Sequence, residues 1–344
     1  MTRVTPQQLA ATRGCMLGLM LGDAIGAAGS TVPSAGTLRA TSAGQLACFT
    51  VEGLVRAHVR GMHKGICHPP GQVWHAYVRW ATMQRISGVR RWQETDWPDG
   101  WLAQVPALRE RRGSAPATVT ALQGGEAGTL EKPGGTSIGA HGLTRSLPAG
   151  LCTWWVSPGE LGASIAALSH SGDAAAAAAL GAAMIHLIGS GHTIVGAAMR
   201  ARSVPHGSWR DTTADLLAPA LAAAEAKPRQ PSELARLAPD ATAQSALLGG
   251  VYVAASFAGR EQVREALLFA AATGAKHAAT VAGALLGAAH GPDALPVDWM
   301  SRMELAWVAD TLARDLVTQV ANSPSGAEYV EATDPHWWER YPGW

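Results

Sequence analysis

Two stretches of the chain place charged side chains where they could do chemistry. Asp23 is the only acidic residue of the apolar segment RGCMLGLMLGDAIGAAGS, residues 13–30. A buried carboxylate is costly unless it is paired, so Asp23 either holds neighbouring backbone or acts as an acid or base, and we favour the structural role. Lys276 and His277 stand at the start of a predicted helix, where a cationic pair suits an anion such as pyrophosphate. The alternative for this pair is a solvated helix start.

Other side chains of suitable type occur in weaker patterns. His63, Cys67 and His68 in HKGICH could ligate a soft metal, but their spacing matches no zinc pattern, which favours a plain loop. Glu52 and Glu126 are weaker candidates for acid or base chemistry. Metal binding at any of these side chains is therefore not expected.

Tryptophan is abundant, with thirteen residues in 344. The pairs Trp154–Trp155 and Trp337–Trp338 could stack on a nucleobase. Most tryptophans are expected in the core or at an interface, and the aromatic tail DPHWWERYPGW is expected to pack on the body or on a partner. The Trp-rich segment 92–101 could fill a cleft.

Composition excludes several classes of function. Charged residues are 15% of the chain and the net charge is +1, so no bulk field attracts nucleic acid or an anionic membrane. Four scattered cysteines without a CxxC pair indicate a reduced, cytoplasmic setting. The N-terminus is too polar for a signal peptide. The apolar run 14–22 is too short to span a bilayer, and the Ala-rich run 174–188 contains His186, so no transmembrane segment is predicted.

The elements that would position these residues are helices. Glycine recurs every fourth residue at 14, 18, 22 and 26, and again at 283, 287 and 291. Four-residue spacing places each set on one helix face, and about 1 kcal/mol lost per interior glycine needs compensation by close packing. We therefore predict that these two helices lie directly against each other in the core, and that the functional site lies near their ends.

The rest of the chain also reads as helical. Thr5, Pro6 and Gln8 form a helix start with a capping box. Helices are expected at 45–58 and 72–86, and in several segments between 143 and 321, while 124–142 reads as a long glycine-rich loop. Few runs alternate with period two. The prediction is an all-α fold in a single domain, residues 1–344.

Four stretches resemble, in the same order, the ADP-ribosylglycohydrolase family, which includes dinitrogenase reductase-activating glycohydrolase. They are GCMLGLMLGDAIGAA, then PATVTALQGG with the glycine-rich loop and GAHGLTRSLPAGL, then LGASIAALSHSGDAAAAAALGAAMIHLI, and finally ATGAKHAATVAGALLGAAHG. The resemblance covers about residues 13–291 and implies the helical fold of that family, with an ADP-ribose cleft. Residues 292–344 would add a C-terminal helix and the aromatic tail.

The resemblance also implies two magnesium ions, yet the metal-binding positions differ here. A Thr-Asp-Asp cluster of the family falls on Thr41, Ser42 and Ala43. An Asp-x-Asp-Thr cluster falls on Gly274, Lys276 and His277, and a further glutamate falls near Ser30. Magnesium prefers oxygen ligands, chiefly carboxylates, and an ammonium at 276 would repel it. We therefore expect no bound metal and no metal-activated water.

By the same resemblance, eight residues would line the ligand cleft: Thr41, Ser42, Gly139, His141, Gly142, His170, Lys276 and His277. His141 and Arg145 could contact ribose or phosphate. The alternatives are that Arg145 satisfies helix carbonyls and that His170 is a structural histidine. Asp173 is expected to cap the following Ala-rich helix.

Three hypotheses follow. The first is a protein that binds ADP-ribose, a related nucleotide or an ADP-ribosylated partner, without the two-magnesium hydrolysis. The second is a metal-independent N-ribosyl hydrolase or lyase that uses Asp23, His141, His277 or Lys276 as acid or base. The third is a scaffold whose cleft is filled. The sequence leaves the oligomeric state open.

Overall fold

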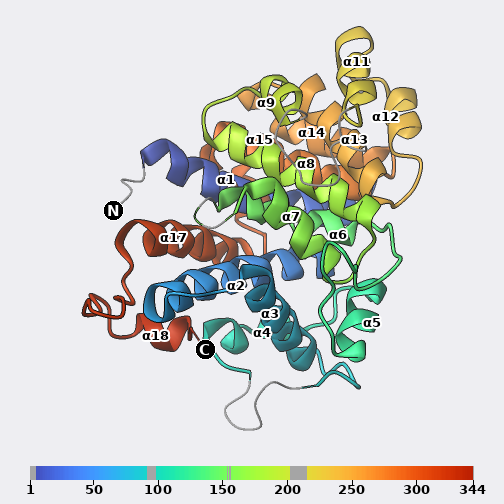
Figure 1. Ribbon diagram of the computed structural model, residues 1–344. Helices are drawn as coiled ribbons and strands as arrows, with labels where there is room; N and C mark the ends of the chain where they lie inside the picture. The colour runs from blue at the N-terminus through green and yellow to red at the C-terminus, as the bar shows by residue number, and fades with distance from the viewer. Residues whose placement is uncertain (1–4, 91–97, 153, 155, 202–214, 344) are drawn as a thin grey trace.

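The computed structural model describes residues 5–90, 98–152, 154, 156–201 and 215–343. These residues form α-helices and short 3-10 turns and no β-strand, which confirms the predicted all-α fold (Figure 1). The helices are α1 Pro6–Ala28, α2 Ser42–Lys64, α3 Pro69–Met83, α4 Pro106–Arg109, α5 Pro116–Gly124, α6 His141–Thr144, α7 Pro158–Ala167, α8 Gly172–Gly189, α9 Ile194–Ala201, α11 Ala218–Ala226, α12 Pro231–Leu237, α13 Ala243–Ser256, α14 Val263–Ala272, α15 Lys276–His290, α16 Val297–Met300, α17 Ala306–Asn322 and α18 Trp337–Arg340.

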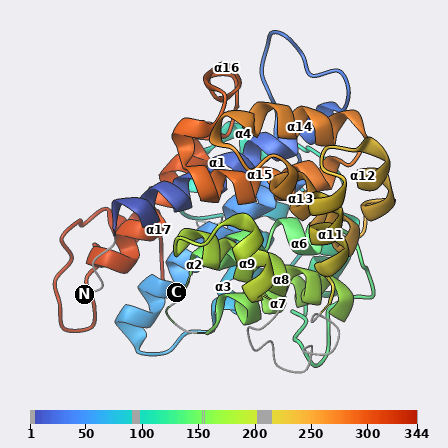
Figure 2. The ribbon, with the colours of Figure 1, turned by 90° about the horizontal axis from the view of Figure 1, so that it is seen from above.

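Helices α1 and α15 lie side by side in the middle of the fold (Figures 1 and 2). A Cβ atom added at Gly18 would lie 2.9 Å from the carbonyl carbon of Gly283 and closer still to its oxygen. A Cβ at Gly14 would lie 2.8 Å from the carbonyl carbon of Gly287 and from the Cα of Gly291. The glycine faces thus meet backbone to backbone, as predicted. This contact fixes the start of α15 beside the end of α1 that carries Asp23.

The ends of several helices differ from the sequence prediction. The capping box of Thr5 and Gln8 is present, and α1 ends before Gly29, whose φ is +64°. Helix α2 begins at Ser42 rather than at residue 45, because Thr41 serves as its N-cap. For residues 143–155 the sequence predicts a helix broken at Pro148; the structure has instead the short α6 followed by a 3-10 turn at Leu147–Leu151 that contains Pro148. At α8 the N-cap is Ser171, so the expectation for Asp173 is wrong; Asp173 lies in the first turn.

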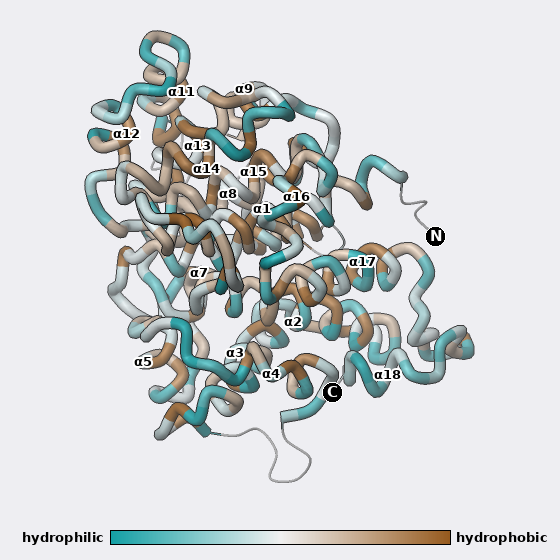
Figure 3. The backbone as a smooth tube through the Cα atoms, turned by 180° about the vertical axis from the view of Figure 1, so that it is seen from behind, coloured by the Kyte–Doolittle hydropathy of each residue, from teal (hydrophilic) through white to brown (hydrophobic). Residues whose placement is uncertain are grey.

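Hydrophobic residues concentrate in the central helices, whereas hydrophilic residues follow the peripheral loops (Figure 3). Helix α8 is long and apolar enough to span a membrane, but 72% of that window is buried inside the protein. Its alanines pack against α7 and the 3-10 turn that follows α6. In this structure α8 is therefore a core helix.

The aromatic tail packs on the body of the protein, which is one of the two arrangements expected from the sequence. Tyr341 is fully buried, and its hydroxyl donates to Asp315 Oδ2 at 2.5 Å. Trp338 packs edge-on against His63 with 4.6 Å between ring centroids. Arg340 lies over the ring of Trp101 at 4.8 Å. The tail thus stabilises the α2–α17 region, and residues 92–97 of the Trp-rich segment lie outside the described residues.

A buried ion cluster joins α2, α3 and the loop before residue 100. Glu52 pairs with Arg56 through Oε1 and with Arg79 through Oε2, and Arg56 also contacts Asp99 at 3.0 Å. Glu52 and Arg56 are at most 2% exposed. Two carboxylates and two guanidiniums balance in charge, so Glu52 has a structural role here.

Candidate functional site

The Asp23 carboxylate holds the start of α2 against α1 through hydrogen bonds. Its Oδ2 accepts hydrogen bonds from the Thr41 backbone N at 2.6 Å and the Gly44 backbone N at 3.2 Å, and its Oδ1 accepts from the Thr41 hydroxyl at 2.8 Å. Burial raises the pKa of Asp23, while these hydrogen bonds and the charge of Lys276 oppose the rise. Both carboxylate oxygens are occupied by donors, which supports the structural role predicted for Asp23.

A pocket of about 360 Å³ opens beside Asp23, where α1, α2, α6 and α15 converge. We call it the Lys276 pocket. It is lined by Asp23, Ala27, Thr41, Ser42, Arg112, Gly113, Ser114, Ala115, Pro116, His141, Lys276 and His277. Six residues named from the sequence therefore come together here from four separate parts of the chain.

Three charged side chains line the pocket, namely Asp23, Arg112 and Lys276. Arg112 pairs with Glu304, which does not line the pocket, through a 3.2 Å contact. The Lys276 side chain is exposed and has no ion-pair or hydrogen-bond partner among the described residues. The Asp23 carboxylate is committed to backbone and hydroxyl donors. A ligand that contributes negative charge would find the ammonium of Lys276 available.

His141 and His277 pack edge to face in the wall of the pocket, with ring centroids 5.6 Å apart and planes at 80°. Burial and the charges of Arg145 and Lys276 lower the pKa of His141 to about 4. Burial, His141 and Lys276 lower the pKa of His277 to about 3. Both imidazoles are therefore neutral at pH 7, and each can donate one hydrogen bond and accept another. The Nδ1 of His141 is buried without a partner.

Two helix starts meet at the pocket, and they differ in how their N–H groups are satisfied. In α2, Ser42 N donates to the carbonyl of Arg112, Ala43 N to the Thr41 hydroxyl and Gly44 N to Asp23. In α15, the N-cap position is Ala275, which provides no side-chain acceptor. Lys276 N donates to Gly274, but the N–H groups of His277 and Ala278 have no acceptor among the described residues.

This helical fold is that of a known family. The family model described as ADP-ribosylglycohydrolase matches residues 5–326. The chain belongs to the ADP-ribosylglycohydrolase family. Among solved structures, one titled "ADP-ribosylglycohydrolase-related protein complex" shares the fold with a TM-score of 0.58. It is 19% identical and aligns over 91% of this chain and 98% of its own. A comparison with curated proteins gives no match.

The match to the ADP-ribosylglycohydrolase family extends beyond the predicted limits of 13–291. It includes α17, which packs against α1 and α2. The last part of the aromatic tail, beyond residue 326, lies outside the match.

The metal positions of an ADP-ribosylglycohydrolase can be tested against the side chains that are present. Ala43 and Gly274 bring no side-chain oxygen, and Lys276 brings an ammonium. Within the described ranges, no group of three or more His, Cys, Asp or Glu side chains is placed to hold a metal ion. This donor set does not match the carboxylate-rich coordination that magnesium prefers.

Three residues expected in the cleft do not line the Lys276 pocket. Gly139 and Gly142 lie in the segment that carries His141, and Gly142 packs on the ring of His170, where an added Cβ would come within 2.9 Å. His170 is 1% exposed, and its Nδ1 lies 2.8 Å from Ser169 Oγ. Burial, with the nearby charges of Arg145 and His141, lowers the pKa of His170 to about 2. His170 thus packs against Gly142 in the loop that carries His141. This is the structural role that was the alternative to ligand contact.

Arg145 follows the structural alternative as well. It is fully buried, and it donates to Thr118 Oγ1 at 2.7 Å, to the carbonyl of Ile165 at 3.1 Å and to Ser169 Oγ at 2.9 Å. Its guanidinium lies 4.6 Å from the ring centroid of Tyr77. Arg145 therefore joins α5, α7 and the turn after α7, and it does not line the pocket.

The glycine-rich loop ahead of His141 is held by α7. Gly134 N donates to the carbonyl of Ala167 at 2.8 Å and Gly128 N to that of Leu168 at 3.3 Å. An added Cβ at Gly135 would lie 2.8 Å from the carbonyl oxygen of Ser169. The glycines are there because the loop backbone lies directly on the carbonyl end of α7.

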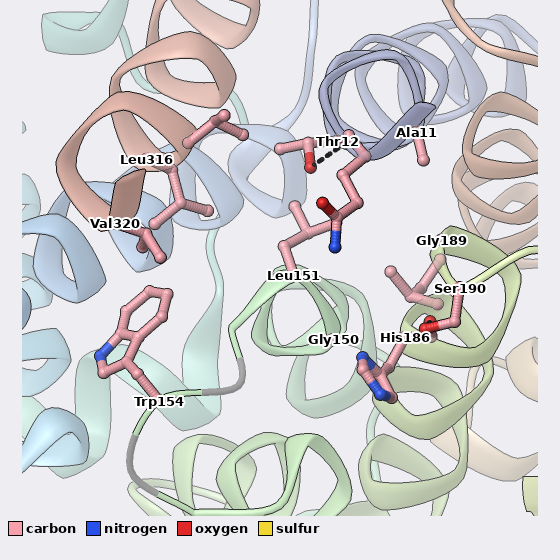
Figure 4. A pocket seen from close by; sticks show the side chains of 13 residues that line it. Ala11, Thr12, Gly150, Leu151, Trp154, His186, Gly189, Ser190, Leu316 and Val320 are labelled. Atoms are coloured by element: carbon pink, nitrogen blue, oxygen red, sulfur yellow. Dashed lines mark hydrogen bonds between the residues drawn. The ribbon is translucent and has the colours of Figure 1, made fainter. Parts of the chain in front are cut away.

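A second, more apolar pocket of about 120 Å³ lies near Trp154 (Figure 4). Thr12 lines it from α1, about 16 Å along the helix from Asp23. Leu316 and Val320 line it from α17, and His186 from α8. Trp154 also packs edge-on against His58 at 5.0 Å. Trp154 is therefore not placed to stack on a ligand in the Lys276 pocket, and Trp155 lies outside the described residues.

Sequence reasoning missed the segment 112–116 of the pocket wall. Arg112 and Ser114 precede the short helix α5 in a stretch with no motif. Their place depends on the hydrogen bond from Ser42 N to the Arg112 carbonyl, which joins residues seventy positions apart. A basic run, RERR at 109–112, was the only signal in the sequence.

Proposed function

We propose that this ADP-ribosylglycohydrolase family member binds ADP-ribose or a related nucleotide, free or attached to a protein, in the Lys276 pocket. The supporting observation is the convergence of Asp23, Thr41, Ser42, His141, Lys276 and His277 around one opening. The exposed ammonium of Lys276 at that opening suits an anionic ligand. The four free cysteines agree with a reduced, cytoplasmic setting.

We further propose that binding occurs without the two-magnesium hydrolysis. The pocket offers one carboxylate, Asp23, and both its oxygens already accept hydrogen bonds from α2. An ammonium at position 276 raises the energy of a dication placed nearby. The protein would then act through recognition of its ligand.

Isothermal titration calorimetry with ADP-ribose tests both statements. We expect the same affinity in magnesium and in EDTA, with no conversion of ADP-ribosyl arginine or O-acetyl-ADP-ribose in either buffer. Binding or turnover that requires magnesium would refute the loss of the metal site. Absence of binding by every nucleotide tested would refute the function itself.

A second candidate is a metal-independent hydrolase or lyase, favoured by the facing pair His141 and His277. Their lowered pKa values make both imidazoles weak bases in the ligand-free pocket, because a good general base has a pKa near the working pH. Turnover that survives EDTA and is lost in His141→Gln would establish this alternative. Because both imidazoles are weak bases, we favour ligand binding over this enzymatic alternative.

A further inference from the structure

The start of α15 is an unfilled hydrogen-bonding position inside the Lys276 pocket. The N–H groups of His277 and Ala278 have no acceptor among the described residues, and the N-cap residue Ala275 has no side chain that could supply one. Helix α15 is 15 residues long, so its dipole adds a partial positive charge at this end. The neighbouring start of α2, by contrast, has its donors paired with Arg112, Thr41 and Asp23.

A second, independent observation points to a ligand at the same place. The Nδ1 of His141 is buried without a partner, although His141 lines this pocket and faces His277 at 5.6 Å. A buried ring nitrogen without a partner is costly. The unpartnered ammonium of Lys276 lines the same pocket. Backbone donors and a cation thus line one pocket, beside a histidine whose Nδ1 has no partner.

We propose that the start of α15, together with Lys276 and His141, forms a phosphate subsite that holds a phosphate or diphosphate group of the ligand. A phosphate oxygen accepts from the N–H groups of His277 and Ala278, and its charge pairs with the ammonium of Lys276. His141, in the tautomer protonated at Nδ1, donates to a second oxygen once its ring turns, because Nδ1 is buried in the ligand-free pocket. The anionic phosphate group of the ligand therefore binds at a position where the family resemblance implies a metal cation.

The glycine contact gives this subsite its geometry. The carbonyl end of residue 276 packs directly on Gly26, where an added Cβ would lie 3.0 Å from the Cα of Lys276. The backbone at the start of α15 is therefore held against α1, and the free N–H groups are fixed before the ligand arrives. Preorganised donors lose little entropy when they bind.

The subsite rests on the proposed function only in that the natural ligand is taken to be a nucleotide, and it can be tested with simpler anions. Calorimetric titrations use inorganic phosphate, pyrophosphate, ADP-ribose and adenosine, each in EDTA. We expect pyrophosphate to bind alone and ADP-ribose to bind at least about tenfold more tightly than adenosine. Lys276→Gln should weaken the binding of pyrophosphate and of ADP-ribose by roughly ten- to a hundredfold, while Lys132→Gln, which removes an exposed ammonium outside the pocket, should not.

Ala275→Asp provides a variant that gains stability if the reasoning holds. The new carboxylate would cap α15 and occupy its free N–H groups, so thermal stability should rise while pyrophosphate binding is lost. A variant that merely misfolds would lose stability, which separates the two cases.

The outcomes distinguish the subsite from the function. Equal affinity for adenosine and ADP-ribose, unchanged in Lys276→Gln and Ala275→Asp, would overturn the subsite and leave nucleotide binding standing. Pyrophosphate binding that depends on Lys276, with no nucleotide binding, would keep the subsite and overturn the proposed ligand. No binding of any anion would overturn both.

Discussion

Replacing Gly18 by alanine tests the central contact of the fold, the backbone contact between α1 and α15. Alanine is the better helix former by about 1 kcal/mol, so the change would stabilise an isolated helix. In this protein its Cβ would lie 2.9 Å from the carbonyl carbon of Gly283, nearer to its oxygen, and 3.2 Å from the Cα of Gly287. All three atoms are backbone, so no side chain can turn away to make room.

The magnitude follows from what must move. Real Cβ atoms essentially never come within 3.0 Å of another heavy atom, so α15 has to shift away from α1. Because α15 is rigid, the shift also loosens the contacts of Gly14 with Gly287 and of Gly22 with Ala279. Overpacking of a core costs about 1–3 kcal/mol or more. We expect Gly18→Ala to lower the free energy of unfolding by about 1–2 kcal/mol, which is the upper half of that cost less the gain in helix propensity.

Urea unfolding followed by helical circular dichroism measures this loss as a lower midpoint at an unchanged slope. Gly189→Ala is the matched control, because its Cβ in α8 would meet only the Cβ of Ala11 at an ordinary 3.8 Å. That variant should be unchanged or more stable by up to about 1 kcal/mol. In the double variant Gly18→Ala/Gly283→Ala, one separation of the helices accommodates both methyl groups, so the two costs should add to less than their sum.

The reasoning fails if Gly18→Ala is as stable as the parent protein, or if it cannot be distinguished from Gly189→Ala. Either result would mean that the two helices tolerate side chains between them, and that the start of α15 is not fixed by the glycine contact.

Three further predictions concern buried charge. The pKa values of His58, His141 and His277 are lowered from 6.5 to about 4, 4 and 3, chiefly by burial, so the unfolded chain takes up protons that the native state does not. Stability should therefore be full above about pH 6.5 and fall as the pH approaches 4, by up to about 1.4 kcal/mol per pH unit for each histidine; a urea midpoint equal at pH 7 and pH 5 would contradict this. Glu52→Gln leaves two buried guanidiniums short of a carboxylate and should cost about 3–5 kcal/mol in urea unfolding. Arg236→Ala at an exposed ion pair should cost less than about 1 kcal/mol, and similar losses in the two variants would refute the contrast. Tyr341→Phe removes the hydrogen bond to Asp315 and should cost about 1–2 kcal/mol by scanning calorimetry, whereas an unchanged stability would show that the tail does not stabilise the body.

The sequence by itself determined the helical class and the pairing of α1 with α15. Local patterns predict both features: the four-residue spacing of glycine, the capping box of Thr5 and Gln8, and the scarcity of runs that alternate with period two. The helical class can be predicted because these patterns involve residues within a few positions of each other. The pairing can be predicted because close packing of the two glycine faces offsets their cost in helix propensity.

Only the tertiary structure decided which polar groups are satisfied. Asp23 holds the start of α2 because Thr41 and Gly44 lie close enough to donate hydrogen bonds to it. Glu52 is part of an ion cluster because α3 places Arg79 beside it. Hydrogen bonds of this kind join residues far apart along the chain, so no local spacing reveals them. The same holds for the start of α15. The sequence singles out Lys276 and His277, but only the folded structure shows the free N–H groups of α15 and the buried Nδ1 of His141 without a partner.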